Sequence, residues 1–169
     1  MTVTAVEKDP AELTLTLTAE FEASPERIWQ LWSDPRQLER WWGPPGYPAT
    51  FTRHDLVVGT RTQYYMTTPE GETPRGYWDI VEVDPPRRIV MNDGFAKADG
   101  SPDEDMPGPG VSVVTIQSIG NGRTRMVFEG GFPSTEAMEQ LLEMGMEQGL
   151  ADAVGQIDAI LAEDAVPAR

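Results

Sequence analysis

Apolar residues in the last part of the chain recur at steps of three and four, the spacing of an amphipathic helix. The pattern runs from Ser134 to Glu163 and predicts one long helix over 134–163. Because a stable fold buries such an apolar stripe, we expect the helix to lie across a sheet formed by the preceding residues. The stripe comprises Met138, Leu141, Leu142, Gly145, Met146, Gly149, Leu150, Ala153, Val154, Ile157, Ile160 and Leu161.

An alternation of apolar and Thr-rich positions from Leu13 to Phe21 predicts a half-buried strand. Ser24-Pro25 follows, and this pair of an N-cap and a first helical residue predicts a short helix. Asp34-Pro35 starts a second short helix, which we expect to end near Arg40. Residues 1–12 carry less pattern, and we expect a flexible N-terminus there.

Six further stretches have the composition and the flanking turn residues of strands. They lie near 49–54, 60–67, 74–83, 87–95, 111–119 and 123–131. A rigid aromatic loop beginning at Trp41-Trp42 precedes the first of them. Residues 97–110 separate the fourth from the fifth and are polar and rich in Pro and Gly, so we expect a mobile lid over a cavity or a disordered hairpin extension.

Composition narrows the class of protein and of partner. The chain has 169 residues, of which 39% are hydrophobic, enough for one domain that we expect over 13–163, with 164–169 as a flexible C-terminus. With 13 Lys and Arg against 28 Asp and Glu the net charge is −15, so we expect neither nucleic acid nor a membrane as a partner. The chain contains no Cys and no apolar run long enough to span a bilayer, and we expect a soluble cytoplasmic protein.

Four segments sharpen the fold prediction. They are residues 23–29 (ASPERIW), 38–44 (LERWWGP), 81–89 (VEVDPPRRI) and 130–134 (GGFPS). In this order the chain resembles the SRPBCC (START-like) superfamily, and within it bacterial-type members of the family named after the C-terminal domain of the heat-shock protein 90 ATPase activator. The resemblance covers nearly the whole chain. It implies an α+β helix-grip fold, in which a curved antiparallel sheet of about six or seven strands wraps a long C-terminal helix, with two short helices after the first strand.

The resemblance specifies function less closely than fold, because one fold carries many functions. Members of the wider superfamily include co-chaperone modules linked to the stress response, carriers of apolar ligands, antibiotic-sequestering proteins and cyclases that shape a polyketide. For this chain it therefore implies three alternatives, which are a ligand carrier, a protein-interaction module and an enzyme.

Catalytic and metal-binding patterns find little support in the sequence. The sole His is His54, between Arg53 and Asp55, and no Gly-x-Ser-x-Gly elbow accompanies it, so we expect a surface side chain without a catalytic role. The acidic residues of 97–110 lack the ordered spacing and the glycine of a calcium loop, so we expect no metal site. A glycine-rich phosphate loop is absent from the sequence, and we expect no cofactor.

An apolar cavity between the sheet and the long helix is the site that the sequence favours. Its candidate ligand-binding residues are Trp41, Trp42, Tyr64, Met66, Trp78, Met91, Phe95, Met126, Phe128, Met138, Leu142, Gly145, Met146 and Gly149. The same side chains would also suit a filled core. Gly145 and Gly149 on the inner face of the helix favour an open space, since a Gly costs a helix about 1 kcal/mol relative to Ala.

Strand alternation leaves two choices in the middle of the sheet. Either Tyr64 and Met66 or Tyr65 and Thr67 point inward, and we expect the first pair to do so. Polar groups that would orient a ligand in the cavity are Gln63, Tyr64, Arg75, Asn92 and Gln117.

The sequence thus predicts a protein, monomeric or homodimeric, that binds a small hydrophobic or aromatic molecule without catalysing a reaction. In the first alternative, a co-chaperone-like module, the acidic surface and the Trp41-Trp42 loop would meet a basic protein partner. In the second, a cyclase-type enzyme, paired ionisable groups would lie in the pocket.

Overall fold

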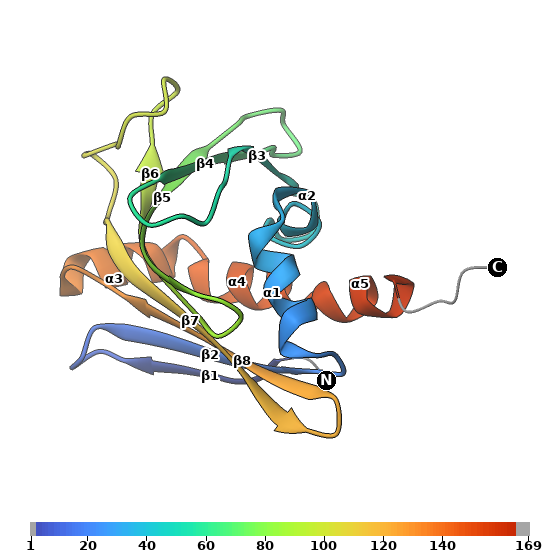
Figure 1. Ribbon diagram of the computed structural model, residues 1–169. Coiled ribbons are helices and arrows are strands. Elements are labelled where there is room, and N and C mark those ends of the chain that lie inside the picture. Colours follow the sequence, from blue (N-terminus) through green and yellow to red (C-terminus); the bar gives the residue numbers. More distant parts are fainter. Residues whose placement is uncertain (1–2, 165–169) are drawn as a thin grey trace.

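The computed structural model describes residues 3–164 and contains a curved antiparallel sheet of eight strands (Figure 1). The strands are β1 (Val3–Asp9), β2 (Thr14–Phe21), β3 (Ala49–Arg53), β4 (Arg61–Met66), β5 (Arg75–Asp84), β6 (Arg88–Ala96), β7 (Gly110–Gly120) and β8 (Arg123–Gly131). Their order is β1-β2-β8-β7-β6-β5-β4-β3, and the sheet stays open between its two edge strands. The six strands predicted after the short helices are confirmed as β3 to β8, each within one residue of its expected ends.

Helices fill the hollow of this sheet, as the predicted α+β helix-grip fold requires. They are α1 (Pro25–Ser33), α2 (Pro35–Leu38), α3 (Thr135–Glu143), α4 (Met146–Gly155) and α5 (Ile157–Asp164). The side chains of Ser24 and Asp34 cap α1 and α2 as expected, and Ser134 caps α3. Figure 1 shows α3, α4 and α5 following one another between the β3–β6 part of the sheet and the part formed by β1, β2 and β8. Of the expected flexible segment 164–169, only Asp164 lies within the described residues, at the end of α5.

The prediction of one continuous C-terminal helix is wrong at one point. The chain leaves the helical path at Met144-Gly145, where Gly145 has a φ of +88° in the left-handed region, whereas Gln156, which separates α4 from α5, keeps a right-handed helical conformation. A left-handed residue cannot continue an α-helix, and glycine adopts this conformation without the steric cost that a Cβ would bring. Gly145 therefore begins α4 instead of lying inside a helix.

The prediction of a flexible N-terminus over 1–12 is also wrong for the residues described there. Val3–Asp9 form the edge strand β1, which pairs antiparallel with β2. Only Val3, Ala5 and Val6 are apolar in this strand, so backbone hydrogen bonds to β2, which leave no pattern in the sequence, supply much of its anchoring. Leu13, expected to begin the strand β2, lies in the connecting turn with a φ of +55°.

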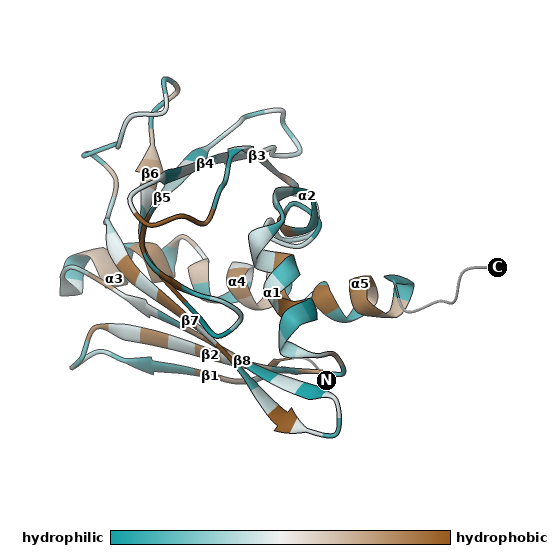
Figure 2. Ribbon diagram, in the orientation of Figure 1, coloured by the Kyte–Doolittle hydropathy of each residue, from teal (hydrophilic) through white to brown (hydrophobic). Residues whose placement is uncertain are grey.

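The hydrophobic core is centred on the indole of Trp32 on α1. Its ring meets Trp41 edge to face at 4.8 Å between centroids and stacks on Phe128 at 6.5 Å. The Nε1 of Trp32 lies 3.2 Å from Met126 Sδ, and Trp41 Nε1 donates a hydrogen bond of 2.9 Å to the carbonyl of Leu31. Figure 2 shows the alternation of hydrophobic and hydrophilic residues along β2 and β7 that turns one face of the sheet toward this core.

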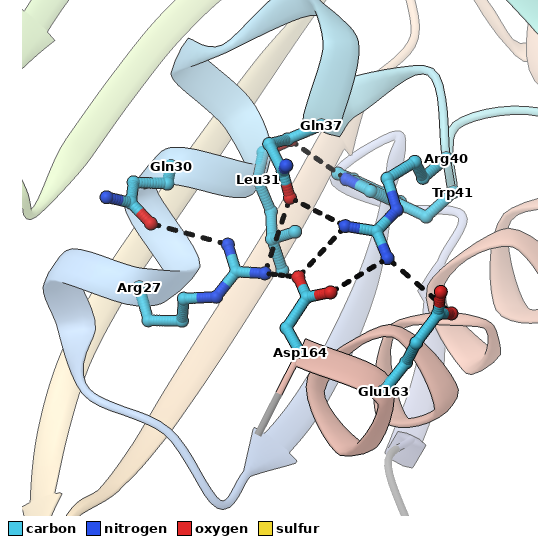
Figure 3. Close-up of polar contacts among 8 residues, drawn as sticks. All are labelled: Arg27, Gln30, Leu31, Gln37, Arg40, Trp41, Glu163 and Asp164. Atoms are coloured by element: carbon cyan, nitrogen blue, oxygen red, sulfur yellow. Dashed lines mark hydrogen bonds and ion pairs between the residues drawn. The ribbon is translucent and has the colours of Figure 1, made fainter. Parts of the chain in front are cut away.

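An ionic cluster fastens the end of α5 to the first two helices (Figure 3). Arg40 grips Asp164 with two hydrogen bonds, of 2.9 Å to Oδ2 and 3.1 Å to Oδ1. Arg27 on α1 contacts the same carboxylate, and Oε1 of Gln37 accepts hydrogen bonds from both guanidinium groups. The hydrogen bond from Arg40 lowers the pKa of Asp164 below its usual range. The cluster thereby joins the C-terminal end of α5 to α1 and to the residues that follow α2.

The prediction that His54 is a surface residue is wrong, because its side chain is buried. Nε2 lies 2.6 Å from the carbonyl oxygen of Trp32, and Nδ1 lies 2.8 Å from Oγ1 of Thr62. A carbonyl can only accept, so Nε2 carries the proton and Nδ1 accepts from the Thr62 hydroxyl. Burial lowers the pKa of His54, which keeps the ring neutral. His54 therefore ties the end of β3 to α1 and β4.

Candidate functional site

A cavity of about 650 Å³ opens between the sheet and the α3–α4 segment. Its walls come from the inner faces of β4, β6, β7 and β8, from both sides of the break at Gly145, and from the loops after Trp42 and before Gly110. Several residues that the sequence predicts as ligand-binding line it together. They are Trp42, Tyr64, Met66, Phe95, Phe128, Gly145, Met146 and Gly149.

The structure places the remaining predicted residues in the core and outside the cavity. Trp41, Trp78, Met91 and Met126 are fully buried in the main core cluster. Met138 belongs to a second cluster with Leu15 and Phe132, and Leu142 packs against that cluster. These residues belong to or pack against the two core clusters and do not line the cavity.

Several residues that line the cavity were not among the predicted ligand-binding residues. They include Tyr47, Asp93, Ser112, Phe132, Met144 and Asp152. The alternation along β6 carries the signal for Asp93, because it lies midway between the inward-facing Met91 and Phe95.

Asp93 and Ser112 form a polar pair on the cavity wall. Ser112 Oγ donates a hydrogen bond of 2.5 Å to Asp93 Oδ2 from the neighbouring strand β7. Burial raises the pKa of Asp93 to about 6, against the opposing effect of the Ser112 hydrogen bond. Asp93 is thus mostly ionised at pH 7.5, although it lies among aromatic neighbours.

Tyr64 points inward, as predicted, and its ring packs between aromatic neighbours. Trp42 meets it at 6.2 Å and Trp78 at 5.7 Å between ring centroids. The Nε1 groups of both indoles are buried without a hydrogen-bond partner among the described residues. Burial raises the pKa of the Tyr64 hydroxyl, and the charge of Asp93 raises it further. The aromatic part of the wall is therefore uncharged, and the charged lining residues are Asp93 and Asp152.

The other polar groups predicted to orient a ligand do not line this cavity. Arg75 lies over the outward-facing Tyr65 ring at 5.1 Å, and Gln63 borders a smaller pocket beside Gly100. Asn92 and Gln117 do not line the cavity either. Of the four, none is placed to hold a ligand in the main cavity.

The loop 97–110 approaches the cavity with its last residues only. Pro107, Gly108 and Gly110 contribute to the lining, while Ala96 and Pro102 form an isolated bridge that closes the other end of the loop on itself. A position at the rim agrees with the idea of a lid. The mobility of the loop stays a prediction.

Within residues 3–164, no group of three or more His, Cys, Asp or Glu side chains is placed to hold a metal ion. The helices in the same range include none with the length and hydropathy needed to cross a membrane.

Comparison with solved structures finds close relatives over the full length. The crystal structure of protein Ms6760 from Mycobacterium smegmatis is 46% identical, with a TM-score of 0.87 and 99% of each chain covered. A protein from Arthrobacter aurescens, solved by NMR in solution, is 44% identical with a TM-score of 0.91, covering 97% of this chain and 94% of its own. The AHSA1 protein from Silicibacter pomeroyi shares the fold, at 21% identity and a TM-score of 0.71 over 89% of this chain and 99% of its own.

Comparison with protein families agrees with this structural similarity. A search of curated proteins finds no match. The family described as "Activator of Hsp90 ATPase homolog 1-like protein" matches residues 22–162, which include α1, the whole cavity wall and most of α5. This range contains the four segments on which the resemblance rests, and the chain therefore belongs to the family of activator of Hsp90 ATPase homolog 1-like proteins.

Proposed function

We propose that the protein binds a small, mainly apolar or aromatic molecule in the cavity between the sheet and the α3–α4 segment. The cavity itself carries the proposal. Its volume of about 650 Å³ falls in the range of small-molecule sites, and its walls are mostly apolar and aromatic with a few polar groups. The fold of this family commonly binds hydrophobic ligands.

Binding without catalysis fits the chemistry of the lining better than an enzymatic role. Among the described residues that line the cavity, Asp93 is hydrogen-bonded to a Ser and not to a His or Lys that would make Ser112 a nucleophile. His54, the sole His, is held by Trp32 and Thr62 away from the cavity.

The position of the Trp41-Trp42 loop favours a ligand-carrier function over a protein-interaction function. That alternative needs an exposed apolar patch at Trp41 and Trp42. Trp41 is fully buried, and Trp42 is half-buried and turned toward the cavity. The two indoles therefore offer little surface to a protein partner.

Filling the cavity from α4 tests the proposal. A Cβ at Gly149 would meet no atom within 4 Å, so Gly149→Phe places a ring in the cavity without a clash at its base. Gly155→Phe is the matched control, because Gly155 ends the same helix, has equally open surroundings and does not line the cavity. Both changes replace a helical Gly, so both variants should remain folded.

The probe is N-phenyl-1-naphthylamine, a neutral aromatic molecule whose emission rises in apolar surroundings. We expect saturable binding to the unmodified protein and to Gly155→Phe, and loss of binding in Gly149→Phe. Equal binding by both variants, or no saturable binding by the unmodified protein, would contradict the proposal.

Cell fractionation tests the expected cytoplasmic location, which we propose together with the binding role.

A further inference from the structure

The charged groups that line the cavity all have the same sign. Asp93 lies on its wall and Asp152 is exposed on α4 at its rim, while no Lys, Arg or His of the described chain contributes to the lining. The whole sequence adds a net charge of −15. A concave surface with apolar walls concentrates such a potential, so the cavity attracts cations and repels anions.

Asp93 has hydrogen-bonding capacity to spare. An ionised carboxylate offers about four acceptor positions. Within residues 3–164, the Asp93 carboxylate accepts one side-chain hydrogen bond, from Ser112 Oγ. The half-buried Asp93 side chain faces the cavity with its remaining surface. A buried carboxylate with free acceptor positions is costly unless another group supplies donors.

The neighbours of Asp93 do not neutralise it. Tyr64 on β4 faces it from inside the cavity, and Tyr77 on β5 lies across the strand pair with its ring over Gly94. The pKa of each phenol hydroxyl is raised above its usual value, so both phenols stay neutral. The guanidinium of Arg61, which lies over the Tyr77 ring at 4.7 Å, is paired with Asp79 at 2.6 Å.

Aromatic rings line the same cavity as the Asp93 carboxylate. Trp42, Tyr64, Phe95 and Phe128 all contribute to the lining. The faces of such rings carry negative electrostatic potential and attract cations, most strongly where water is excluded. A cavity with ring faces and one carboxylate is therefore complementary to a molecule with a cationic head and an apolar body.

We propose that the ligand of this cavity is a protonated amine with an aromatic or aliphatic body, and that Asp93 binds its ammonium group while the rings of Trp42 and Tyr64 flank it. The inference rests on the proposed function, because it assigns the polar end of the same ligand. Ser112 holds the carboxylate in place.

Three probes with one apolar body test this assignment. They are 2-(2-naphthyl)ethylamine, 2-(2-naphthyl)ethanol and 2-naphthylacetic acid, which present a cation, a neutral hydroxyl and an anion. Isothermal titration calorimetry at pH 7.5 measures each affinity. We expect the amine to bind at least about tenfold more tightly than the alcohol, since hydrogen bonds between charged partners are the stronger ones. The acid should bind most weakly.

Two variants separate Asp93 from the general negative charge of the protein. Asp93→Asn keeps the shape and the contact with Ser112 and should bring the amine to within about twofold of the alcohol, because the ionic attraction is gone. Glu129→Gln removes the same charge from the outer face of β8, outside the cavity, and should retain the preference. Circular dichroism spectra check that both variants are folded.

A pH titration of the unmodified protein gives a second readout that needs no variant. The amine remains protonated from pH 7.5 to pH 5, whereas Asp93, with a pKa of about 6, becomes protonated. The affinity for the amine should fall about tenfold over this range, and that for the alcohol should stay constant.

The outcomes distinguish the two proposals. If none of the three probes binds, the proposed function itself fails. If the alcohol binds and equals the amine, or if the preference for the amine persists in Asp93→Asn, the cavity binds ligands but the assignment of Asp93 is overturned.

Discussion

The phenol ring of Tyr64 lies directly over Gly76, its partner across the β4–β5 ladder. A Cβ at position 76 would fall 2.4 Å from the Tyr64 hydroxyl oxygen. The missing side chain of Gly76 therefore determines how far the Tyr64 ring stays out of the cavity. Tyr77 lies over Gly94 in the same way on the opposite face of the sheet.

We expect Gly76→Ala to push the Tyr64 ring toward the cavity and to lower the affinity for an apolar probe. The clash should also cost about 1 to 3 kcal/mol of stability, the usual range for overpacking. Gly94→Ala is the comparison, because its added Cβ would meet Tyr77 on the outer face of the sheet and not a ring on the cavity wall. Urea denaturation and probe titration of both variants check the prediction, and a larger loss of affinity in Gly94→Ala would contradict it.

The buried His54 should make the protein less stable as the pH falls below 6.5. Its pKa is about 6.5 in the unfolded chain and is lowered in the folded state, so the unfolded chain binds more protons between those two values. Stability from the neutral ring is then complete above pH 6.5 and is lost as the pH falls toward the lowered value.

His54→Gln checks this dependence. The variant should be less stable at pH 7.5 by about 1 to 3 kcal/mol, since a buried partner of Trp32 or Thr62 is lost. Its stability should depend less steeply on pH between 6.5 and 5.5. Urea denaturation at both pH values measures this, and an unchanged slope would show that His54 does not titrate in the unfolding reaction.

Asp93 should change the folding stability with pH in the opposite direction to His54. Its pKa is raised from 3.8 to about 6, so the folded state binds more protons than the unfolded chain between those values. Stability should fall as the pH rises through this window and stay lower above pH 6. Asp93→Asn should therefore be more stable than the unmodified protein at pH 7.5, by about 1 to 3 kcal/mol.

This gain should shrink at pH 4.5, where Asp93 is mostly protonated in the folded protein. Chemical denaturation at the two pH values tests it, with Glu129→Gln as the control for net charge. A gain that is equal at both pH values would mean that the charge of Asp93 is not the cause.

The contacts of Asp164 should stabilise α5 itself and have little effect on the rest of the fold. Asp164→Asn weakens the contacts with Arg40 and Arg27, which are partly exposed, so we expect only a small loss of stability. Amide hydrogen exchange should become faster in α5 and stay unchanged in β7 and β8. Asp158→Asn, on the exposed side of the same helix, should leave exchange in α5 unaltered.

The sequence predicts the sheet well because alternation and turn residues are local properties. β2 shows this most clearly, since every second side chain from Leu15 to Phe21 is buried. The edge strand β1 escapes prediction because its pairing with β2 depends on the backbone. The break at Gly145 escapes it too, since the apolar stripe continues on both sides of a residue that changes direction through its φ angle.

The candidate site is predictable only in part, for a related reason. Alternation limits the inward-facing residues of β4 to two sets, one of which contains Tyr64, but it does not show that Trp78 is buried in the core while Tyr64 borders the cavity. That difference arises from the Trp42 ring, which meets Trp78 at 4.9 Å and comes from a loop without a periodic pattern. Asp93 obeys the alternation of β6, and a search for polar residues at inward positions would have found it.

The main core around Trp32 and the cavity share only part of their side chains. Phe128 belongs to both, whereas Phe95 and Met144 border the cavity and do not belong to the buried cluster of Trp32, Trp41 and Met126. A substitution at Phe95 or Met144 should therefore have a small effect on whether the chain folds. Ligand preference can diverge through such substitutions while the scaffold persists, which makes this architecture tolerant of evolutionary change in specificity.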